Sequence, residues 1–527
     1  MTRSLSEKQE HDVQIEPIKS FTNENIKHDD VIATILSVEG KEVNLTGDVD
    51  EAMQLALKAD HIHIDEETNK RLLRKTDLYL MPLLCFLYSC QFMDKVSNSY
   101  AAVMGLRTDL NMVGDMYSWC GSAFYLGYLF FEFPASALLQ RFPVSKAVSC
   151  FIVIWGIVLC LHSAPNYAGF IFLRTVLGML ESAVTPAMVI ITGQWYKAEE
   201  QFTRTSIWFS FNGFGTIMGS AIAYGLAIRA ESYSIEAWKI LFIVTGLMTI
   251  VVGIAFYIHI PDSPATAWFL TEEEKLLVVE RIRSNQQGFG NKHFKMHQLR
   301  EALTDQVTWL YFFFGLASDI PNGSLTNFGS ILLSEDFGYS ATESLLMNMP
   351  TGAVEVVGCT LFGLLQRYVP HRMFIAIFAT VVTLASACML AFASESKNAR
   401  LGGYYLMTVS PVGMICALSC FSSNTAGHTK KLVANAIFLI GYCVGNLIGP
   451  QTFIAAQAPS YTGGKVSIVV CYAASLVLLV WIYAVYYFEN KKRDKLRENM
   501  GDSYVKIENS EFADLTDKEN PDFRYRL

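Results

Sequence analysis

The sequence predicts an all-α membrane protein with twelve transmembrane helices in two six-helix bundles. Three observations lead to this fold class: the composition is apolar, long apolar stretches recur, and one long polar break divides them. Of the 527 residues, 52% are hydrophobic and 17% are charged, whereas soluble proteins usually carry about 25% charged residues. The charges gather in residues 1–75, 261–305 and 489–527, so the segments between them are still more apolar than the average indicates.

Apolar stretches that can cross the hydrocarbon core of a bilayer, about 30 Å thick, recur along the chain. They cover residues 77–97, 115–138, 145–163, 167–191, 204–228, 238–260, 307–333, 345–366, 371–393, 402–424, 432–456 and 465–488. The only long break follows the sixth stretch. Two sets of six indicate two repeated bundles around a site near the membrane midplane.

The break and the ends of the chain complete the expected domain organisation. The parts are a disordered cytosolic tail (1–75), an N-terminal bundle (76–260), a cytosolic linker with an amphipathic helix (261–306), a C-terminal bundle (307–488) and a cytosolic tail (489–527). In the linker, Thr271 and Glu274 form a capping box that predicts a surface helix up to about Arg283.

Basic residues indicate the orientation in the membrane, because cytosolic loops carry an excess of lysine and arginine. They gather before the first stretch and after every second one, at Lys70, Arg71, Arg74, Lys75, Arg141, Lys146, Lys197, Arg204, Lys275, Arg281, Arg283, Lys292, Lys295, Arg367, Arg372, Lys430, Lys431, Lys491, Lys492, Arg493 and Lys495. The opposite loops hold fewer, such as Arg107, Arg229, Lys397, Arg400 and Lys465. Both termini are therefore expected in the cytosol, and an odd number of spans would spoil the asymmetry.

Several other classes of protein find little support in the sequence. The first 75 residues are polar and contain no cleavable signal sequence. No basic patch with interleaved aromatic residues favours nucleic acid, and the 11 cysteines lack metal-ligand spacing. No nucleotide-binding loop or catalytic motif is present. We expect no cofactor and no metal, and an ion gradient as the energy source.

Asp94 and Lys95, at the end of the first apolar stretch, are candidates for function because charges inside a membrane are costly. Neighbouring helical residues point about 100° apart, so these two do not simply pair with each other. Lys95 is either an anchor for a carboxylate or sulfonate, or an interfacial lysine that reaches the outer surface.

Arg174 and Glu181 lie two helical turns apart on one face of the fourth stretch. A carboxyl group in a low-dielectric site can exchange protons near physiological pH, so Glu181 is the first candidate for proton coupling. The alternative is a structural ion pair, or a hydrogen bond to a neighbouring helix.

Further polar residues in the apolar stretches are weaker candidates. They are Glu132, Asp319, Glu355, Asn98, Asn424 and Asn446. Asp319 to Gly323 also resembles a helix break that could line a cavity, Glu355 is alternatively a buried structural acid, and the asparagines are alternatively links between helices. Glycines in the fifth and eleventh stretches allow close helix contact, which suits either a hinge or static packing.

Several motifs occur together in an order and spacing that are specific. They are Met93-Asp94-Lys95 with Asn98 and Ala101; Phe124 to Tyr128 with Glu132-Phe133-Pro134; Leu173-Arg174 with Gly178, Glu181 and Pro186; Trp238 to Gly253 with Pro261-Asp262 and Ala267 to Thr271; Asn424 to Lys431; and Gly445 to Gln451. Over about residues 70–490 the chain resembles the fungal allantoate permease family, or anion:cation symporters, of the major facilitator superfamily.

The resemblance implies a major facilitator fold and uptake driven by protons. Asp94-Lys95 and the C-terminal residues 514–525 resemble the branch with yeast transporters for cysteine and for a thiamine-regulated solute. The resemblance implies that Lys95 anchors the substrate, that Glu181 serves proton coupling, and that Arg141 keeps part of a gating contact although the usual acid beside it is missing. From the polar residues in the apolar stretches we further expect Asn98, Asp319, Asn424 and Asn446 to bind substrate, Asp94 and Glu355 to serve proton coupling, and Glu132 and Arg174 to have gating or structural roles.

The leading hypothesis is a secondary transporter, a monomer in the plasma membrane, that takes up a small organic anion such as a carboxylate, a vitamin or a sulfur compound with protons. An internal membrane such as the endoplasmic reticulum is the alternative location. Other hypotheses are a nutrient sensor that binds solute without net transport, and a channel, which would lack a coupling carboxylate. A membrane enzyme is disfavoured because no catalytic cluster is present.

Overall fold

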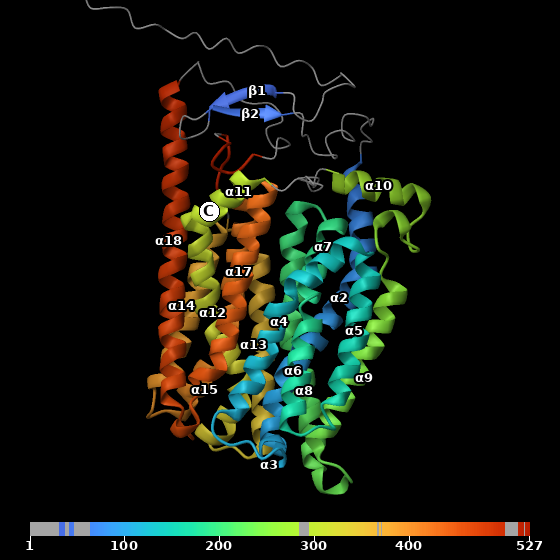
Figure 1. Ribbon diagram of the computed structural model, residues 1–527, viewed down its shortest axis with the longest axis vertical. Helices are drawn as coiled ribbons and strands as arrows, with labels where there is room; N and C mark the ends of the chain where they lie inside the picture. The colour runs from blue at the N-terminus through green and yellow to red at the C-terminus, as the bar shows by residue number, and fades with distance from the viewer. Residues whose placement is uncertain are drawn as a thin grey trace, which may run out of the picture.

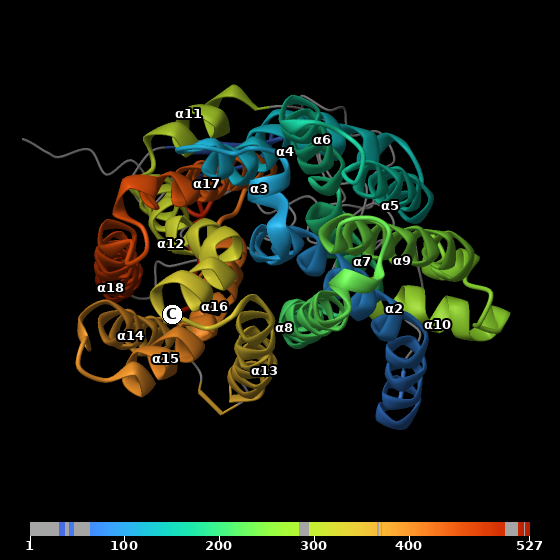
Figure 2. The same cartoon turned by 90° about the horizontal axis from the view of Figure 1, so that it is seen from below.

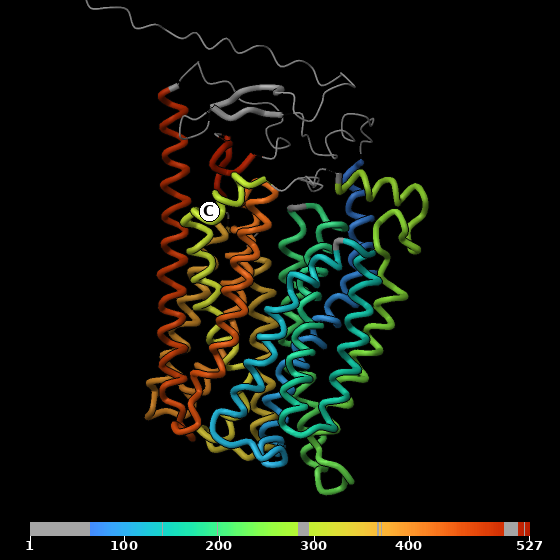
Figure 3. The backbone as a smooth tube through the Cα atoms, in the orientation of Figure 1, coloured from blue at the N-terminus to red at the C-terminus, as the bar shows by residue number. Residues whose placement is uncertain are grey.

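The computed structural model describes residues 31–36, 42–46, 64–283, 295–365, 368–369, 371–500, 515–520 and 522–527. Long helices stand side by side in two groups, and the first and second halves of the chain form one group each (Figure 1, Figure 2). The described segment that begins at residue 64 and the C-terminal residues 522–527 lie at the same end of the molecule (Figure 3).

The N-terminal bundle consists of six membrane-spanning units. They are α2 (Glu66–Ala101), α4 (Met116–Arg141), α5 (Val144–Leu161), α6 (Tyr167–Glu181) continued by α7 (Val184–Trp195), α8 (Ala198–Ile228) and α9 (Ala237–His259). Buried aromatic and aliphatic residues such as Trp155, Trp195 and Trp238 fill its core. Each predicted span of this half lies on one of these units.

The C-terminal bundle repeats this arrangement. Its units are α12 (Gln306–Ile331), α13 (Ala341–Leu365), α14 (Arg372–Phe392), α15 (Lys397–Leu406) with η5 (Met407–Val409) and α16 (Ser410–Asn424), α17 (His428–Ile448) and α18 (Thr462–Met500). The two bundles meet where α8 packs along α13, α4 along α17, and α2 along α12.

The predicted fold class is confirmed, although the spans differ in polarity. Ten of the described helices are long and apolar enough to cross a membrane, judged by length and composition alone. The remaining two units, α2 and α12, are long but carry more polar residues, such as Asp94, Lys95, Asp319 and Asn322. Helices α2 and α12 therefore place more polar groups inside the membrane than the ten apolar spans do, and they pack against each other across the bundle interface.

Short elements close the two ends of the bundles. On one end lie α10 (Glu272–Arg283), α11 (Met296–Thr304) and the C-terminal segment, residues 515–520 and 522–527; we call this end the tail face. The opposite end, the far face, carries η1 (Ala102–Leu106), α3 (Arg107–Asp109), η2 (Ala230–Ser232) and η4 (Leu332–Asp336). The connections η3 (Pro264–Thr266), η6 (Gly449–Thr452) and η7 (Ala455–Gln457) complete the chain.

The predicted capping box is present at the start of α10. The Thr271 amide donates to the Glu274 carboxylate at 3.0 Å, and the Glu274 amide donates to the Thr271 hydroxyl at 3.3 Å. The second linker helix, α11, has no counterpart in the sequence-based prediction.

The predicted disorder of residues 1–75 is wrong in part. Strands β1 (Val31–Leu36) and β2 (Glu42–Thr46) pair antiparallel, in segments rich in β-branched residues that favour strands. In addition, α2 begins at Glu66, because the Asp65 carboxylate accepts from the Thr68 amide at 2.9 Å and caps the helix. Residues 1–30, 37–41 and 47–63 lie outside the described residues.

The predicted helix break at Asp319 to Gly323 is also wrong. Helix α12 runs through this segment with Pro321 inside it. Neighbouring helices and polar side chains can satisfy the backbone groups that a proline frees within a membrane helix, so the helix continues through Pro321.

Candidate functional site

Lys95 on α2 and Glu181 at the end of α6 meet in the interior of the N-terminal bundle. The Lys95 ammonium lies 3.8 Å from the Glu181 carboxylate, and the two side chains are 11% and 0% exposed. Neither carboxylate oxygen of Glu181 has a hydrogen-bond partner among the described residues. The charges therefore attract each other without a direct hydrogen bond, which leaves the ammonium open to a competing anion and the carboxylate open to a proton.

Aromatic rings of α4 lie beside the ammonium, and a ring of the other bundle packs against them. Lys95 Nζ lies 5.8 Å from the ring centre of Phe124 and 5.9 Å from that of Tyr128, both on α4. Tyr442 on α17 contacts the rings of Tyr125 and Tyr128 at 6.4 and 6.3 Å. Ring faces attract cations and exclude water, so this aromatic wall holds the ammonium while leaving its donors available.

Polar groups of the C-terminal bundle lie opposite Lys95. The Asn446 amide donates to the Asp319 carboxylate at 3.2 Å, and the Asn322 amide donates to the Asn446 oxygen at 2.9 Å. Asp319 and Cys443 both lie within electrostatic range of the Lys95 ammonium. The structure therefore brings together Lys95, Glu181, Asp319 and Asn446, four of the residues selected from the sequence.

Asp94 points away from Lys95, as expected for neighbouring helical residues. One carboxylate oxygen accepts from the Thr249 hydroxyl on α9 at 3.0 Å, and the other has no hydrogen-bond partner among the described residues. Asp94 is fully buried, so it lies in the packing between α2 and α9 rather than at the bundle interface.

Arg174 supports the aromatic wall from behind. Its guanidinium stacks over Phe124 at 5.3 Å and donates through Nε to the Cys120 carbonyl at 3.2 Å. It forms no salt bridge with Glu181 within 4 Å, although both residues lie on α6, so Glu181 pairs with the lysine of α2 instead.

The two weaker acidic candidates lie at other points of the bundle interface. Glu132 on α4 accepts from the Cys443 thiol on α17 at 3.7 Å. Glu355 on α13 is 5% exposed and lies where α13 packs against Gly213 of α8. Both acids are therefore buried between the bundles, at points separate from the Lys95–Glu181 pair.

Asn98 links the bundles on the far-face side of Lys95. Its amide donates to the Asn327 oxygen on α12 at 3.1 Å and to the Tyr117 hydroxyl at 3.3 Å. The Tyr117 hydroxyl in turn donates to the Asn327 carbonyl at 2.6 Å. Asn98 thus belongs to a layer of hydrogen bonds between the bundles that lies next to the site.

Two further predicted residues lie at the ends of helices, away from the Lys95–Glu181 pair. Asn424 lies at the tail face, where its side chain binds the backbone of Arg526. Arg141 is exposed at the end of α4. Asn424 was selected because it stands in a motif that resembles the family. Such a motif does not reveal at which end of the molecule the residue lies.

The glycines of the fifth and eleventh spans lie at close helix contacts. Gly213 on α8 touches the backbone of Gly352 on α13, and a Cβ at Gly445 on α17 would lie 2.5 Å from the Leu316 carbonyl on α12. No larger residue fits at these two points unless the helices move apart. The predicted close packing is present in both halves.

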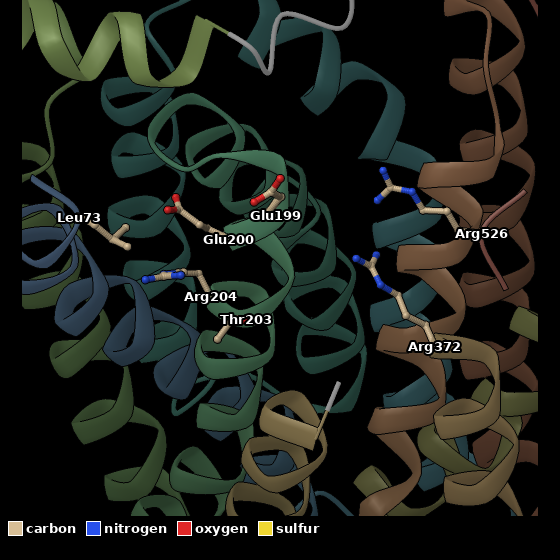
Figure 4. A pocket seen from close by; sticks show the side chains of 7 residues that line it. All are labelled: Leu73, Glu199, Glu200, Thr203, Arg204, Arg372 and Arg526. Atoms are coloured by element: carbon tan, nitrogen blue, oxygen red, sulfur yellow. The ribbon is translucent and has the colours of Figure 1, made fainter. Parts of the chain in front are cut away.

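A pocket of about 460 Å³ opens at the tail face between the bundles. Its lining comes from both sides (Figure 4) and consists of Leu73, Glu199, Glu200, Thr203, Arg204, Arg372 and Arg526. At the far face, by contrast, Arg107 donates to Glu335 at 2.7 Å and joins the two bundles. The molecule is thus closed by an ion pair at the far face and hollowed at the tail face.

Sequence reasoning missed the residues that complete the site, namely Tyr125, Tyr128, Tyr442 and Asn322. Tyr125 and Tyr128 stand in the motif quoted above, but their role was not inferred.

Two six-helix bundles that enclose a charged, aromatic centre in the membrane define a multi-pass membrane transporter. The family model described as "Major Facilitator Superfamily" matches residues 84–450. The chain belongs to this superfamily and, within it, to the allantoate permease family.

Named relatives agree with this assignment. The chain is 52% identical to the allantoate permease of Saccharomyces cerevisiae, over 100% of this chain and 99% of the relative. It is 33% identical to the thiamine pathway transporter of the same organism, over 96% and 95% of the two chains. The chain is thus more similar to the allantoate permease than to the thiamine pathway transporter, and its relatives are transporters and not enzymes.

Solved structures show the same fold. The structure of the proton:xylose symporter XylE, bound to 6-bromo-6-deoxy-D-glucose, matches with a TM-score of 0.59, over 78% of this chain and 96% of that chain, at 12% identity.

Proposed function

We propose that the chain takes up a small organic anion together with protons, and that the Lys95–Glu181 pair couples the two. The observation that carries the proposal is the buried ammonium of Lys95, which lies 3.8 Å from a carboxylate without hydrogen-bond partners and faces the other bundle. A buried charge is stable only when it is paired, so the carboxylate of Glu181 and that of an incoming anion compete for one ammonium.

This competition links the anion to the proton. A proton on Glu181 removes its negative charge, and Lys95 then needs another anion as a partner. The substrate carboxylate supplies it, so proton and anion bind together and the buried site stays electrically balanced. When Glu181 loses its proton on the cytosolic side, its carboxylate reclaims Lys95 and the substrate leaves.

The substrate class that fits best is a carboxylate with ureido or amide groups. Lys95 pairs with the carboxylate, Asp319 accepts from N–H groups, and the amides of Asn446 and Asn322 offer both donors and acceptors. Allantoate has one carboxylate and two ureido groups, and a relative that is 52% identical is an allantoate permease. We therefore propose allantoate as the first substrate to test.

The proposal places the tail face in the cytosol, the far face outside the plasma membrane, and a monomer as the working unit. The lysines and arginines near the tail face support this orientation through the excess of positive charge in cytosolic loops. Epitope tags at both termini should be labelled only after the cells are permeabilised; labelling of intact cells would contradict the orientation.

The test of function is uptake by proteoliposomes that contain the purified protein. Labelled allantoate is offered with vitamins, sulfur amino acids and simple monocarboxylates as competitors, with and without an imposed pH gradient. We expect accumulation only with the more acidic solution on the side of the far face, and competition by anions alone. Binding without accumulation under any gradient would favour the nutrient sensor instead.

A further inference from the structure

The C-terminal segment reaches back along the tail face and ends beside the pocket between the bundles. Two asparagines hold its backbone in place. Asn490 of α18 donates to the Tyr525 carbonyl at 2.8 Å and accepts from the Tyr525 amide at 3.0 Å. Asn424 of α16 binds Arg526 in the same two-sided manner, at 2.8 and 2.7 Å. Both asparagine side chains bind only backbone atoms of the segment, so they do not hold the side chain of Arg526.

The side chain of Arg526 points into the pocket, next to Arg372 of α14 (Figure 4). The two guanidiniums are near enough to repel each other. Arg372 also stacks over Phe202 of α8 at 5.1 Å, so this cationic pair already approaches the N-terminal bundle. Arg372 also donates to the Ser419 hydroxyl, and an acid that approaches the two guanidiniums would reduce the repulsion between these like charges.

An acidic residue faces this pair from α8. Glu199 lies in the first turn of α8, three residues before Phe202, and its carboxylate points into the same gap (Figure 4). Its neighbour Glu200 is engaged elsewhere, since it caps the Lys197 amide at 3.0 Å and pairs with Arg281 of α10. Glu199 is exposed, and no ion pair joins it to another described residue.

We infer that Glu199 and the Arg372–Arg526 pair form the gate of the tail face, and that the C-terminal segment supplies one half of it. When the bundles rock so that the pocket closes, the acid of α8 meets the two arginines; when they rock back, the gate opens to the state described here. The Arg107–Glu335 pair is its counterpart at the far face.

This inference rests on the proposed function only for the rocking of the two bundles, and it requires neither the substrate nor the proton. Its test therefore uses no substrate. Ser99 of α2 is the reporter: it is 2% exposed, lies near the far-face end of α2, and accepts from the Ser330 amide of α12 at 3.1 Å. A cysteine at this position reacts with a maleimide only when the bundles part at the far face.

The measurement is the rate of maleimide labelling of Ser99→Cys in purified protein in lipid nanodiscs, where both faces meet solution whatever the orientation in cells. The parent chain without the reporter gives the background from the 11 native cysteines. Opening at the far face requires the tail-face gate to close. We therefore expect Arg526→Glu to slow labelling by about two- to fivefold, the range for one exposed ion pair.

Glu199→Arg should slow labelling to a similar extent, and the double variant Glu199→Arg with Arg526→Glu should restore the parent rate. The matched control is Arg524→Glu in the same segment, because Arg524 pairs with Asp494 and donates to the Asn490 carbonyl at 3.1 Å. The inference is overturned if Arg526→Glu labels at the parent rate, if Arg524→Glu slows labelling equally, or if the double variant is no faster than either single one.

Discussion

At the scale of single residues, Lys95 has two kinds of neighbour, a carboxylate and aromatic rings. The Glu181 carboxylate neutralises it at 3.8 Å, while the Phe124 and Tyr128 rings accept its charge without a hydrogen bond. An arrangement that served only stability would bring the carboxylate into hydrogen-bonding contact, as Lys465 and Asp336 do at 3.1 Å. The wider Lys95–Glu181 separation is what a site for exchange between partners requires.

Lys95→Ala should abolish uptake. Without the ammonium, the carboxylate of a bound anion would be a buried charge without a partner, at a cost of about 3–5 kcal/mol, which corresponds to at least a hundredfold loss of anion binding. Surface expression and thermal stability should fall little, because a neutral Glu181 can form in place of the pair. The matched control is Lys465→Ala, a buried lysine near the far face. Uptake by Lys95→Ala at more than about a tenth of the parent rate would contradict the anchor role.

Glu181→Gln should separate exchange from accumulation. The amide keeps the shape of the side chain but neither carries a proton nor neutralises Lys95, so the anion binds at least as tightly at every pH. We expect exchange of labelled for unlabelled substrate to persist, while accumulation under a pH gradient is lost. Glu132→Gln, another buried acid on the bundle interface, is the control. Accumulation by Glu181→Gln equal to that of the parent would assign the proton elsewhere.

At the scale of elements, the C-terminal segment is tied to the bundle by a buried cluster of charges. Lys430 at the start of α17 is 1% exposed and contacts three carboxylates, Glu301, Asp305 and Asp517, at 2.8, 2.8 and 2.7 Å. Asp517 belongs to the segment, and the Tyr525 hydroxyl donates to it at 2.7 Å. One lysine therefore joins α11, α12, α17 and the segment.

Asp305, the cap of α12, indicates how this cluster responds to pH. Burial raises the pKa of its carboxyl, but Lys430 and Lys518 outweigh burial and hold the pKa below its usual value. A carboxyl with a depressed pKa stabilises the folded state at pH values above its unfolded pKa and loses this contribution as the pH falls through the folded pKa. The contribution of Asp305 is therefore constant through the mildly acidic range in which the proposed symport operates.

Asp517→Asn should loosen the C-terminal segment. Lys430 keeps two of its carboxylates, so we expect a loss of about 1–3 kcal/mol, the cost of leaving a buried polar group poorly paired. Limited proteolysis of the segment in purified protein measures the effect, and cleavage should be faster by about fivefold or more. Asp494→Asn, which removes an exposed partner of Arg524, should leave the rate unchanged. Equal cleavage of the parent and Asp517→Asn would contradict the anchoring role.

The elements themselves were largely predictable from the sequence, because a helix that crosses a membrane must present a long apolar run. The start of α9 at Ala237 and its end at His259 lie within one residue of the predicted stretch 238–260. The extension of α2 to Glu66 was not predictable in the same way. The Asp65 cap is a local signal for the start of this helix. The polar extension also makes contacts with α10, such as Lys75 with Glu274 at 2.6 Å, and contacts between distant segments leave no local pattern.

The difference between local patterns and contacts of distant segments also decides which parts of the site could be predicted. Lys95, Glu181 and Asp319 stand out because a charge in an apolar run is rare. Their pairing was not predictable, since α6 was as free to pair Glu181 with Arg174 along its own face. Tyr442 and Asn322 were missed because an aromatic or amide residue in a membrane helix is common, and only the packing of α17 on α4 and α12 assembles them.

At the scale of the whole molecule, charged contacts between the bundles are distributed unequally over the two faces. The far face carries the Arg107–Glu335 pair, and the Tyr461 hydroxyl donates to the same Glu335 at 2.8 Å. The tail face carries the pocket, with Glu199, Glu200 and Arg204 on one wall and Arg372 and Arg526 on the other. Helices α8 and α13 touch through Gly213 and Gly352, and this contact is the point about which the proposed rocking would exchange one set of ion pairs for the other.

Arg107→Gln should shift this balance toward opening at the far face. The variant removes the cation of an ion pair whose side chains are 36% and 30% exposed, so the gain is about 0.2–1 kcal/mol. Labelling of Ser99→Cys should accordingly be about one-and-a-half- to fivefold faster, and Arg229→Gln, an exposed far-face arginine, should leave it unchanged. Faster labelling by both variants would indicate a general effect of charge on the reagent.

One equilibrium connects the state that is open at the far face with the state that is open at the tail face. Variants that favour opposite states should therefore cancel each other when they are combined. Arg107→Gln favours the state that is open at the far face, and Arg526→Glu favours the state that is open at the tail face. Because the two sites lie at opposite ends of the molecule and share no partner, their free energies should add. The double variant should therefore label Ser99→Cys at close to the parent rate. A double variant as fast as Arg107→Gln alone would mean that the tail-face residues do not take part in the rocking of the bundles.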